Sequence, residues 1–258
     1  MKAFELTDWL NGQYRCSAAE EWDNVGLLVG DDTREVRKVF LALDATDSVI
    51  EQAALWGADM LITHHPMIFG GVKKINNHSF TGRRILALVK NDIVYYAMHT
   101  NYDILGMADL SAEYLKLRNP GVLAATSEDG SEGFGRVGAL SDPMPLKDFA
   151  AFVKEQLCIP DVRVYGDPDR VVKTAAVCTG SGKSMLKDVK KSGADVYVTG
   201  DIDYHTGIDA VADGLCIVDA GHYGTEHVFP EAMKKVLSER FPDLEYQCAA
   251  WEPPYLLV

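Results

Sequence analysis

The stretch "WGADMLITHH" (residues 56–65) has a counterpart in "SGADVYVTGD" (192–201). Each stretch contains a Gly-Ala-Asp turn followed by a short apolar run that ends in threonine. Gly57 and Gly193 stand where a preceding helix would end, because glycine adopts positive φ at little cost. The two stretches therefore predict the same event twice: a helix ends, the chain turns and a buried strand begins.

Further repeats flank these stretches. Apolar strands are expected at "KVFLALD" (38–44) and at "KTAAVCT" (173–179), before the two helices. After them, "IVYYAMHTNYD" (93–103) matches "CIVDAGHYGTE" (216–226), and each strand ends in His-x-x-x-acid. Strands that alternate with helices predict βαβ units and a largely parallel sheet. Chance similarity between generic βαβ units is the alternative to an internal duplication.

The boundary between the two halves is expected in the small, polar and glycine-rich stretch "ATSEDGSEGFG" (125–135). The last strand and helix are expected to return to the first half. The sequence thus predicts one α/β half from residues 1–124 plus 216–258, and a second α/β half from residues 125–215.

Composition limits the class of protein. The chain has 258 residues, of which 47% are hydrophobic and 24% charged, as in soluble globular proteins. Its formal net charge of −13 disfavours nucleic acid and anionic membranes as partners. Glu5 and Asp8 interrupt the region where an export signal would need an apolar run. Five scattered cysteines without a C-x-x-C pair favour a reduced, cytoplasmic protein.

Histidines and acids gather at the expected strand ends. In parallel α/β sheets, ligands bind beyond the carboxyl ends of the strands. His64 and His65 stand there before Pro66, which favours an extended conformation for the residue preceding it. At such a corner the two imidazoles can splay toward two adjacent metals. His222 and Glu226 are four residues apart, which puts them on one side of a helical turn.

The strand ends supply three imidazoles and two carboxylates, those of Asp103 and Glu226. This set suits borderline divalent ions such as Zn, Fe, Mn, Co or Ni. Five ligands are too many for one catalytic zinc, which usually has three protein ligands. They suit two metals that share a bridging carboxylate and a water. His99 is left open as a residue beside the metals or as a proton-transfer group. His78, His205 and His227 are interpreted as ordinary core or surface residues.

A second motif resembles a phosphate-binding loop but fails. "CTGSGKS" (178–184) follows an expected strand and ends in Gly-Lys-Ser, yet the first glycine of a P-loop would fall at Val177. The lysines of the following segment, 186–191, are interpreted as a solvated helix face.

Six motifs together resemble the Nif-three-like dinuclear metal-centre family, whose members are often labelled GTP cyclohydrolase I type 2 homologues. The match spans nearly the whole chain, in order. The motifs are "EWDNVGLLVG" (21–30), "THHPMIF" (63–69), "HTNYD" (99–103), "GRVG" (135–138), "TGDIDYH" (199–205) and "DAGHYGTE" (219–226).

The resemblance implies two interlinked α/β halves of similar topology and a toroidal homohexamer. It implies two divalent metal ions per subunit, with ligands that map onto His64, His65, Asp103, His222 and Glu226, most of them in the first half. It places His99 near the metals. The family commonly has two adjacent histidines where this chain has Tyr204-His205, so a role for the first of them is not carried over.

The implied function is a metal-dependent hydrolase that acts on a small molecule, as a GTP cyclohydrolase does when water attacks C8 of a guanine ring. His99 is the expected acid–base catalyst. The alternative is a non-catalytic metal-binding protein or interaction scaffold.

Overall fold

The computed structural model describes residues 1–255 and divides the chain into two compact units. The first comprises Met1–Tyr102 and Val228–Val258, and the second Asp103–His227. Residues 256–258, which end the predicted segment 216–258, lie outside the described residues. The units divide earlier than position 124 and later than position 216, because the strands that include those positions pair within the second unit.

The first unit has a five-stranded sheet in the order β1-β4-β3-β2-β11. Its strands run parallel except for β1 at the edge. The strands are β1 (Gly26–Val29), β2 (Lys38–Ala42), β3 (Met60–Thr63), β4 (Val94–Ala97) and β11 (Glu245–Cys248). The helices are α1 (Ala3–Gln13), η1 (Cys16–Ala18), α2 (Asp47–Trp56), α3 (Phe80–Lys90), α4 (Thr100–Tyr102) and α10 (Phe229–Arg240).

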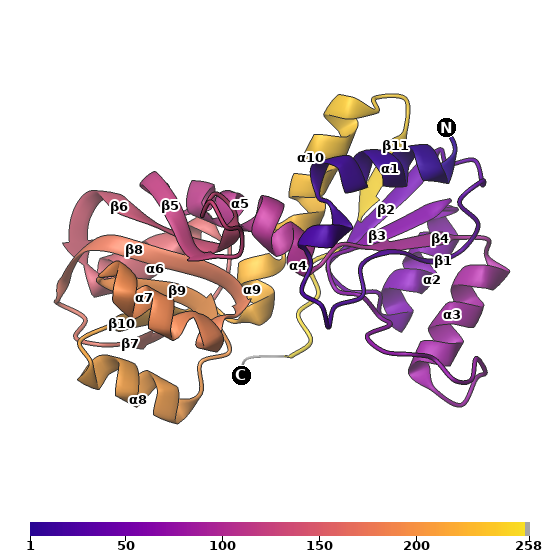
Figure 1. Ribbon diagram of the computed structural model, residues 1–258. Helices are drawn as coiled ribbons and strands as arrows, with labels where there is room; N and C mark the ends of the chain where they lie inside the picture. The colour runs from indigo at the N-terminus through magenta and orange to yellow at the C-terminus, as the bar shows by residue number, and fades with distance from the viewer. Residues whose placement is uncertain (256–258) are drawn as a thin grey trace. The chain divides into compact units, whose positions relative to one another are not determined.

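Helices cover both faces of this sheet (Figure 1). Alternate strand residues such as Phe40 and Ala42 pack against α2 and α3 in one apolar cluster. On the other face lie α1 and α10, and α10 packs against β2. Burial on both faces explains why the central strands β3 and β4 are buried along their whole length rather than at alternate residues.

The second unit has a six-stranded sheet in the order β5-β6-β8-β9-β10-β7. The strands are β5 (Arg118–Ala125), β6 (Gly133–Pro145), β7 (Arg163–Tyr165), β8 (Val171–Ser181), β9 (Val196–Gly200) and β10 (Cys216–Asp219). The helices are η2 (Asp103–Met107), α5 (Ala108–Tyr114), α6 (Leu146–Gln156), η3 (Gly182–Met185), α7 (Leu186–Ser192), α8 (Tyr204–Ala212) and α9 (His222–Glu226). One apolar cluster joins α7 and α8 to this sheet.

The expectation of a largely parallel sheet is wrong for this second unit. β8, β9 and β10 are parallel, but β5, β6 and β7 join the sheet in antiparallel fashion. The glycine-rich stretch 125–135 is the connection of the β5–β6 hairpin and lies inside the unit. Turn-forming residues connect a hairpin as readily as two domains, so composition alone did not distinguish the two.

The repeated core is present in both units as three adjacent parallel strands, β2-β3-β4 and β8-β9-β10. Gly57 and Gly193 end α2 and α7 at φ of 76° and 74°. Asp59 accepts hydrogen bonds from two backbone N–H groups at the start of β2, and Asp195 does the same at the start of β8. The Gly-Ala-Asp motif thus fixes each helix end to the neighbouring strand.

The third repeated strand is shifted by one residue relative to the sequence alignment. The strand register makes Val94 equivalent to Cys216. The counterpart of His222 is therefore Thr100 and not His99.

Replacing Asp195 with alanine leaves two backbone N–H groups at the start of β8 without their acceptor. We expect Asp195→Ala to lower the free energy of unfolding by about 2 kcal/mol, the cost of orphaned donors. Urea denaturation measures the effect. Asp169→Ala, which removes an exposed carboxylate paired with Lys147, is the control and changes stability by less than about 0.5 kcal/mol. Equal losses in both variants would contradict the role given to the motif.

Candidate metal-binding residues

The corner after β3 is fixed by a hydroxyl network. The Thr63 Oγ1 donates to the His65 carbonyl at 2.8 Å, and the Tyr95 hydroxyl lies 2.9 Å from Thr63 Oγ1. The Met67 N–H donates to the same Tyr95 oxygen at 3.0 Å. Burial raises the pKa of Tyr95 to about 12, so this hydroxyl keeps its proton at neutral pH. These hydrogen bonds therefore fix the backbone that carries His64 and His65.

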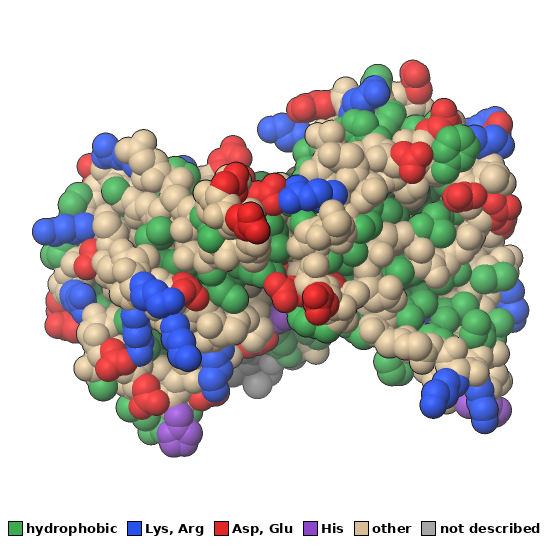
Figure 2. Space-filling view, viewed as in Figure 1, with side chains coloured by type: hydrophobic (Ala, Val, Ile, Leu, Met, Phe, Trp, Pro, Cys, Tyr) green, Lys and Arg blue, Asp and Glu red, His purple; other side chains and the backbone are tan. Residues whose placement is uncertain are grey.

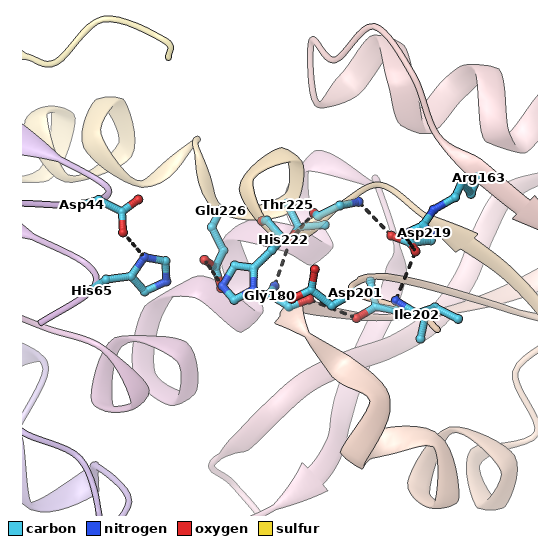
Figure 3. A network of polar contacts seen from close by, with 12 residues as sticks. Asp44, His65, Arg163, Gly180, Asp201, Ile202, Asp219, His222, Thr225 and Glu226 are labelled. Carbon is cyan, nitrogen blue, oxygen red and sulfur yellow. Dashed lines mark hydrogen bonds and ion pairs between the residues drawn. The ribbon is translucent and has the colours of Figure 1, made fainter. Parts of the chain in front are cut away.

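Each histidine at this corner has one ring nitrogen engaged. His64 is buried, and its Nδ1 lies 2.9 Å from the Met98 carbonyl oxygen. A carbonyl only accepts, so Nδ1 carries the proton and Nε2 keeps a lone pair. The His65 Nδ1 lies 2.8 Å from Asp44 Oδ1, as Figure 3 shows. Asp44 follows β2, the neighbour of β3, and directs the His65 Nε2 in the same way.

His99 is held by a buried carboxylate. Its Nδ1 lies 3.0 Å from Asp23 Oδ1, and Asp23 Oδ2 accepts from the Thr100 N–H and Oγ1. Burial raises the pKa of Asp23, but hydrogen bonds from His99 and Thr100 outweigh it and lower the pKa to about 2. Ring nitrogens of His64, His65 and His99 lie within 4.8 Å of one another. The first unit thus gathers three of the predicted residues.

The second unit gathers the other three. α9 is a single turn, and it brings His222 Nε2 to 3.1 Å from Glu226 Oε2. The His222 Nδ1 lies 2.8 Å from Asp201 Oδ2, so this histidine is oriented as His65 is. Carboxylate oxygens of Asp103 and Glu226 lie within 4.8 Å of each other. Burial, with a smaller effect of these two charges, raises the pKa of the Cys178 thiol to about 12.

A buried carboxylate, Asp219, supports the turn into α9. It accepts from the N–H of Gly221 at 2.9 Å and from the N–H of Ile202 at 3.1 Å, and it pairs with Arg163 at 2.6 Å (Figure 3). The segment that carries Asp201 is thereby tied to the turn that carries His222.

A glycine at the end of β8 leaves room for the Glu226 carboxylate. Gly180 adopts φ of 64°, and a Cβ added there would overlap Glu226 Oε1. The Gly180 N–H donates to Thr225 Oγ1 at 2.9 Å, which holds α9 against the strand. Only glycine satisfies both the backbone conformation and this close approach.

The remaining histidines lie elsewhere, and none joins a metal-capable group in residues 1–255. The His227 Nε2 bonds the Leu157 carbonyl at 2.7 Å, and His205 packs edge-on against Tyr204. His78 is exposed. Reasoning from the sequence missed the orienting acids Asp44 and Asp201. Their signal was present, because each follows a strand at the edge where the histidines stand.

Lysines of the Gly-Lys-Ser loop and of the helix that follows it pair with neighbouring carboxylates. Lys183 pairs with Asp203 at 2.5 Å, and Lys191 pairs with Asp188 at 2.9 Å. Lysine and arginine side chains gather over α7 in Figure 2, on an exposed face. In the described part of the chain, no helix has the length and apolar character of a membrane span.

The family described as Duf34/NIF3 (NGG1p interacting factor 3) matches residues 1–253. The chain belongs to this family. A relative from Clostridium perfringens named GTP cyclohydrolase 1 type 2 homolog is 37% identical over 230 residues, which span 88% of each chain. The Duf34/NIF3 resemblance inferred from six motifs is therefore confirmed.

Solved structures agree with this Duf34/NIF3 assignment. The crystal structure of a Bacillus cereus protein related to NIF3 matches with a TM-score of 0.94 at 27% identity, covering 100% of this chain and 99% of that one. Reduced HcgD from Methanocaldococcus jannaschii matches with a TM-score of 0.82 at 34% identity, covering 96% and 97%.

Introducing a methyl group at Gly180 displaces the Glu226 carboxylate. We expect Gly180→Ala to weaken binding of Zn²⁺ or Mn²⁺ by about tenfold or more, the range seen when a ligand loses its positioning. Gly193→Ala is the matched control, because its φ of 74° imposes the same backbone strain where a Cβ meets open space. Calorimetric titration compares the two. Equal affinities would contradict the role given to Gly180.

Removing the carboxylate that orients His65 frees the ring to rotate and to change tautomer. We expect Asp44→Ala to lower metal affinity about 10- to 100-fold. Asp47→Ala, which removes a nearby exposed carboxylate paired with Arg84, leaves the affinity unchanged. If metal affinity fell only in the Asp47 variant, the orienting role given to Asp44 would be wrong.

Proposed function

We propose that the protein binds two divalent metal ions per chain through His64, His65, Asp103, His222 and Glu226. The observation that carries the proposal is the orientation of the histidines. His64, His65 and His222 each engage Nδ1 with a fixed acceptor, so Nε2 is the ring nitrogen that would bind a metal. Proteins hold metal-ligating histidines in this way.

The donor set fits such ions. Neutral imidazole nitrogens with carboxylate oxygens suit Zn, Fe, Mn, Co or Ni. The Glu226 carboxylate is buried, and a buried carboxylate is costly unless it is paired or coordinates a metal. Because Gly180 has no side chain, the Glu226 carboxylate can lie against its backbone. Five protein ligands exceed the needs of one catalytic ion and support the proposal of two.

We propose that the activity is hydrolysis of a small molecule. Two bound metals would lower the pKa of a water molecule and polarise a substrate oxygen. The protein's own contribution is His99, whose Nδ1 proton is held by Asp23 and whose Nε2 can accept or return a proton. The name of the curated relatives, GTP cyclohydrolase 1 type 2 homolog, supports this class of reaction.

The second candidate is a non-catalytic metal-binding protein or interaction scaffold. The family description, NGG1p interacting factor 3, favours it because it names an interaction rather than a reaction. The two candidates share the metal ligands and differ in whether His99 moves a proton.

The assembly is proposed to be a homohexamer. Its support is the family membership together with exposed apolar side chains along α8, namely Tyr204, Ile208 and Val211, which recur at helical spacing. Size-exclusion chromatography with light scattering gives the mass of the assembly directly.

The free thiols of all five cysteines support a reducing, cytoplasmic location. The net charge of −13 makes nucleic acid an unfavoured partner.

Metal analysis tests the proposed ligands. We expect purified protein loaded with Zn²⁺ or Mn²⁺ to hold about two ions per chain by mass spectrometry of the metals, as in two-metal sites. Glu226→Gln lowers this content because an amide binds a cation less well than a carboxylate. Glu239→Gln, on the exposed face of α10, is the control. Wild-type content in the Glu226 variant would remove this residue from the ligand set.

Turnover separates the two candidates. We expect metal-loaded protein to hydrolyse at least one member of a panel of GTP, cyclic amides and phosphoesters. His99→Gln then lowers kcat about 100-fold or more while the metal content stays unchanged, since general acid–base catalysis contributes about 10²- to 10⁴-fold. If loaded wild type hydrolyses nothing in the panel, the scaffold candidate is favoured.

A further inference from the structure

Two large aromatic side chains are exposed beside the histidine cluster of the first unit. Trp22 is 60% exposed and Phe69 is 54% exposed. Tryptophan and phenylalanine normally bury most of their surface, so exposed rings that converge on one place indicate a contact surface. Trp22 and Asp23 lie in the connection that leads into β1, and Phe69 follows the double-histidine corner.

Both rings converge on His99. The Trp22 ring centroid lies 5.9 Å from that of His99 at an interplanar angle of 76°, and the Phe69 centroid also lies 5.9 Å away, at 85°. Neither ring stacks face to face on the imidazole. More than half of the surface of Trp22 and of Phe69 is exposed, so both side chains are accessible to a ligand that approaches His99.

The segments that carry the two rings are bound to each other and to α4. The Asn24 side-chain amide donates to the Ile68 carbonyl at 2.6 Å, which joins the segment of Trp22 to the segment of Phe69. The Glu20 N–H donates to Thr100 Oγ1 at 2.9 Å, on the other side of Trp22. These bonds fix the backbone segments that carry the rings, so less conformational entropy of the backbone is lost when a ligand binds.

We infer that Trp22 and Phe69 form a stacking site for the planar heterocyclic part of a ligand, and that they place this part at His99. A planar π-system is the ligand chemistry that gains most from open aromatic faces, whereas an anionic or sugar group would be served by metal ions and hydrogen bonds alone. The inference deepens the proposed function and rests on it only in taking the stacked ligand to be the substrate.

Calorimetric titration of the full-length protein tests the site with four fixed probes. Guanosine, pterin and nicotinamide supply a planar ring, and ribose 5-phosphate supplies none. We expect at least one planar probe to bind, and Trp22→Ala and Phe69→Ala each to weaken it about tenfold or more, as the loss of one stacking partner does. Phe80→Ala is the matched control, because Phe80 is 56% exposed in the same unit but lies at the start of α3.

Three results overturn the inference. The first is that none of the planar probes binds wild type, and the second is that Phe80→Ala weakens binding as much as Phe69→Ala does. The third is that the Trp22 and Phe69 variants keep wild-type affinity and change only the oligomeric state, which would make the rings a contact between protein chains. Metal content measured on the same samples separates this inference from the proposed function. If the Trp22 and Phe69 variants bind the probe more weakly and keep their full metal content, the loss is due to the aromatic pair and not to the metal ligands. If the wild type holds no metal, only the proposed function is contradicted.

Discussion

The arrangement of the candidate residues depends on one repeated interaction, the hydrogen bond from a histidine Nδ1 to a fixed acceptor. The acceptor is a backbone carbonyl for His64 and a carboxylate for His65, His99 and His222. Each bond selects one tautomer and one ring orientation. Four rings that are each oriented through Nδ1 are more than surface histidines require.

The two units use equivalent positions for different purposes. His65 follows β3, and the residue at the equivalent place after β9 is Asp201. Asp201 does not join a metal-capable group within residues 1–255, but orients His222. The same strand-end position therefore supplies a metal-binding ring in one unit and the support for such a ring in the other. The backbone also differs at this position, because Asp201 adopts φ of 58° whereas His65 precedes a proline, which favours an extended conformation.

Sequence reasoning was most successful where the physics is local. Apolar periodicity and the Gly-Ala-Asp turns predicted the repeated strands and the caps at Gly57 and Gly193. The clustering of histidines at strand ends followed from parallel topology. The antiparallel strands of the second unit were missed, because the stretch 125–135 has the composition of a hairpin and of a linker alike. The motif "EWDNVGLLVG" contains Asp23 but does not predict its role, since the pairing of Asp23 with His99 joins distant parts of the chain that no local pattern connects.

The central claim is that oriented histidines present Nε2 to bound metal, and an anomalous-scattering crystal structure of the zinc-loaded protein tests it most directly. The account predicts anomalous peaks for zinc ions that are coordinated by Nε2 of His64, His65 and His222, with each Nδ1 still hydrogen-bonded to its present acceptor. Zinc bound through Nδ1, or anomalous peaks that are absent from these histidines, would contradict it.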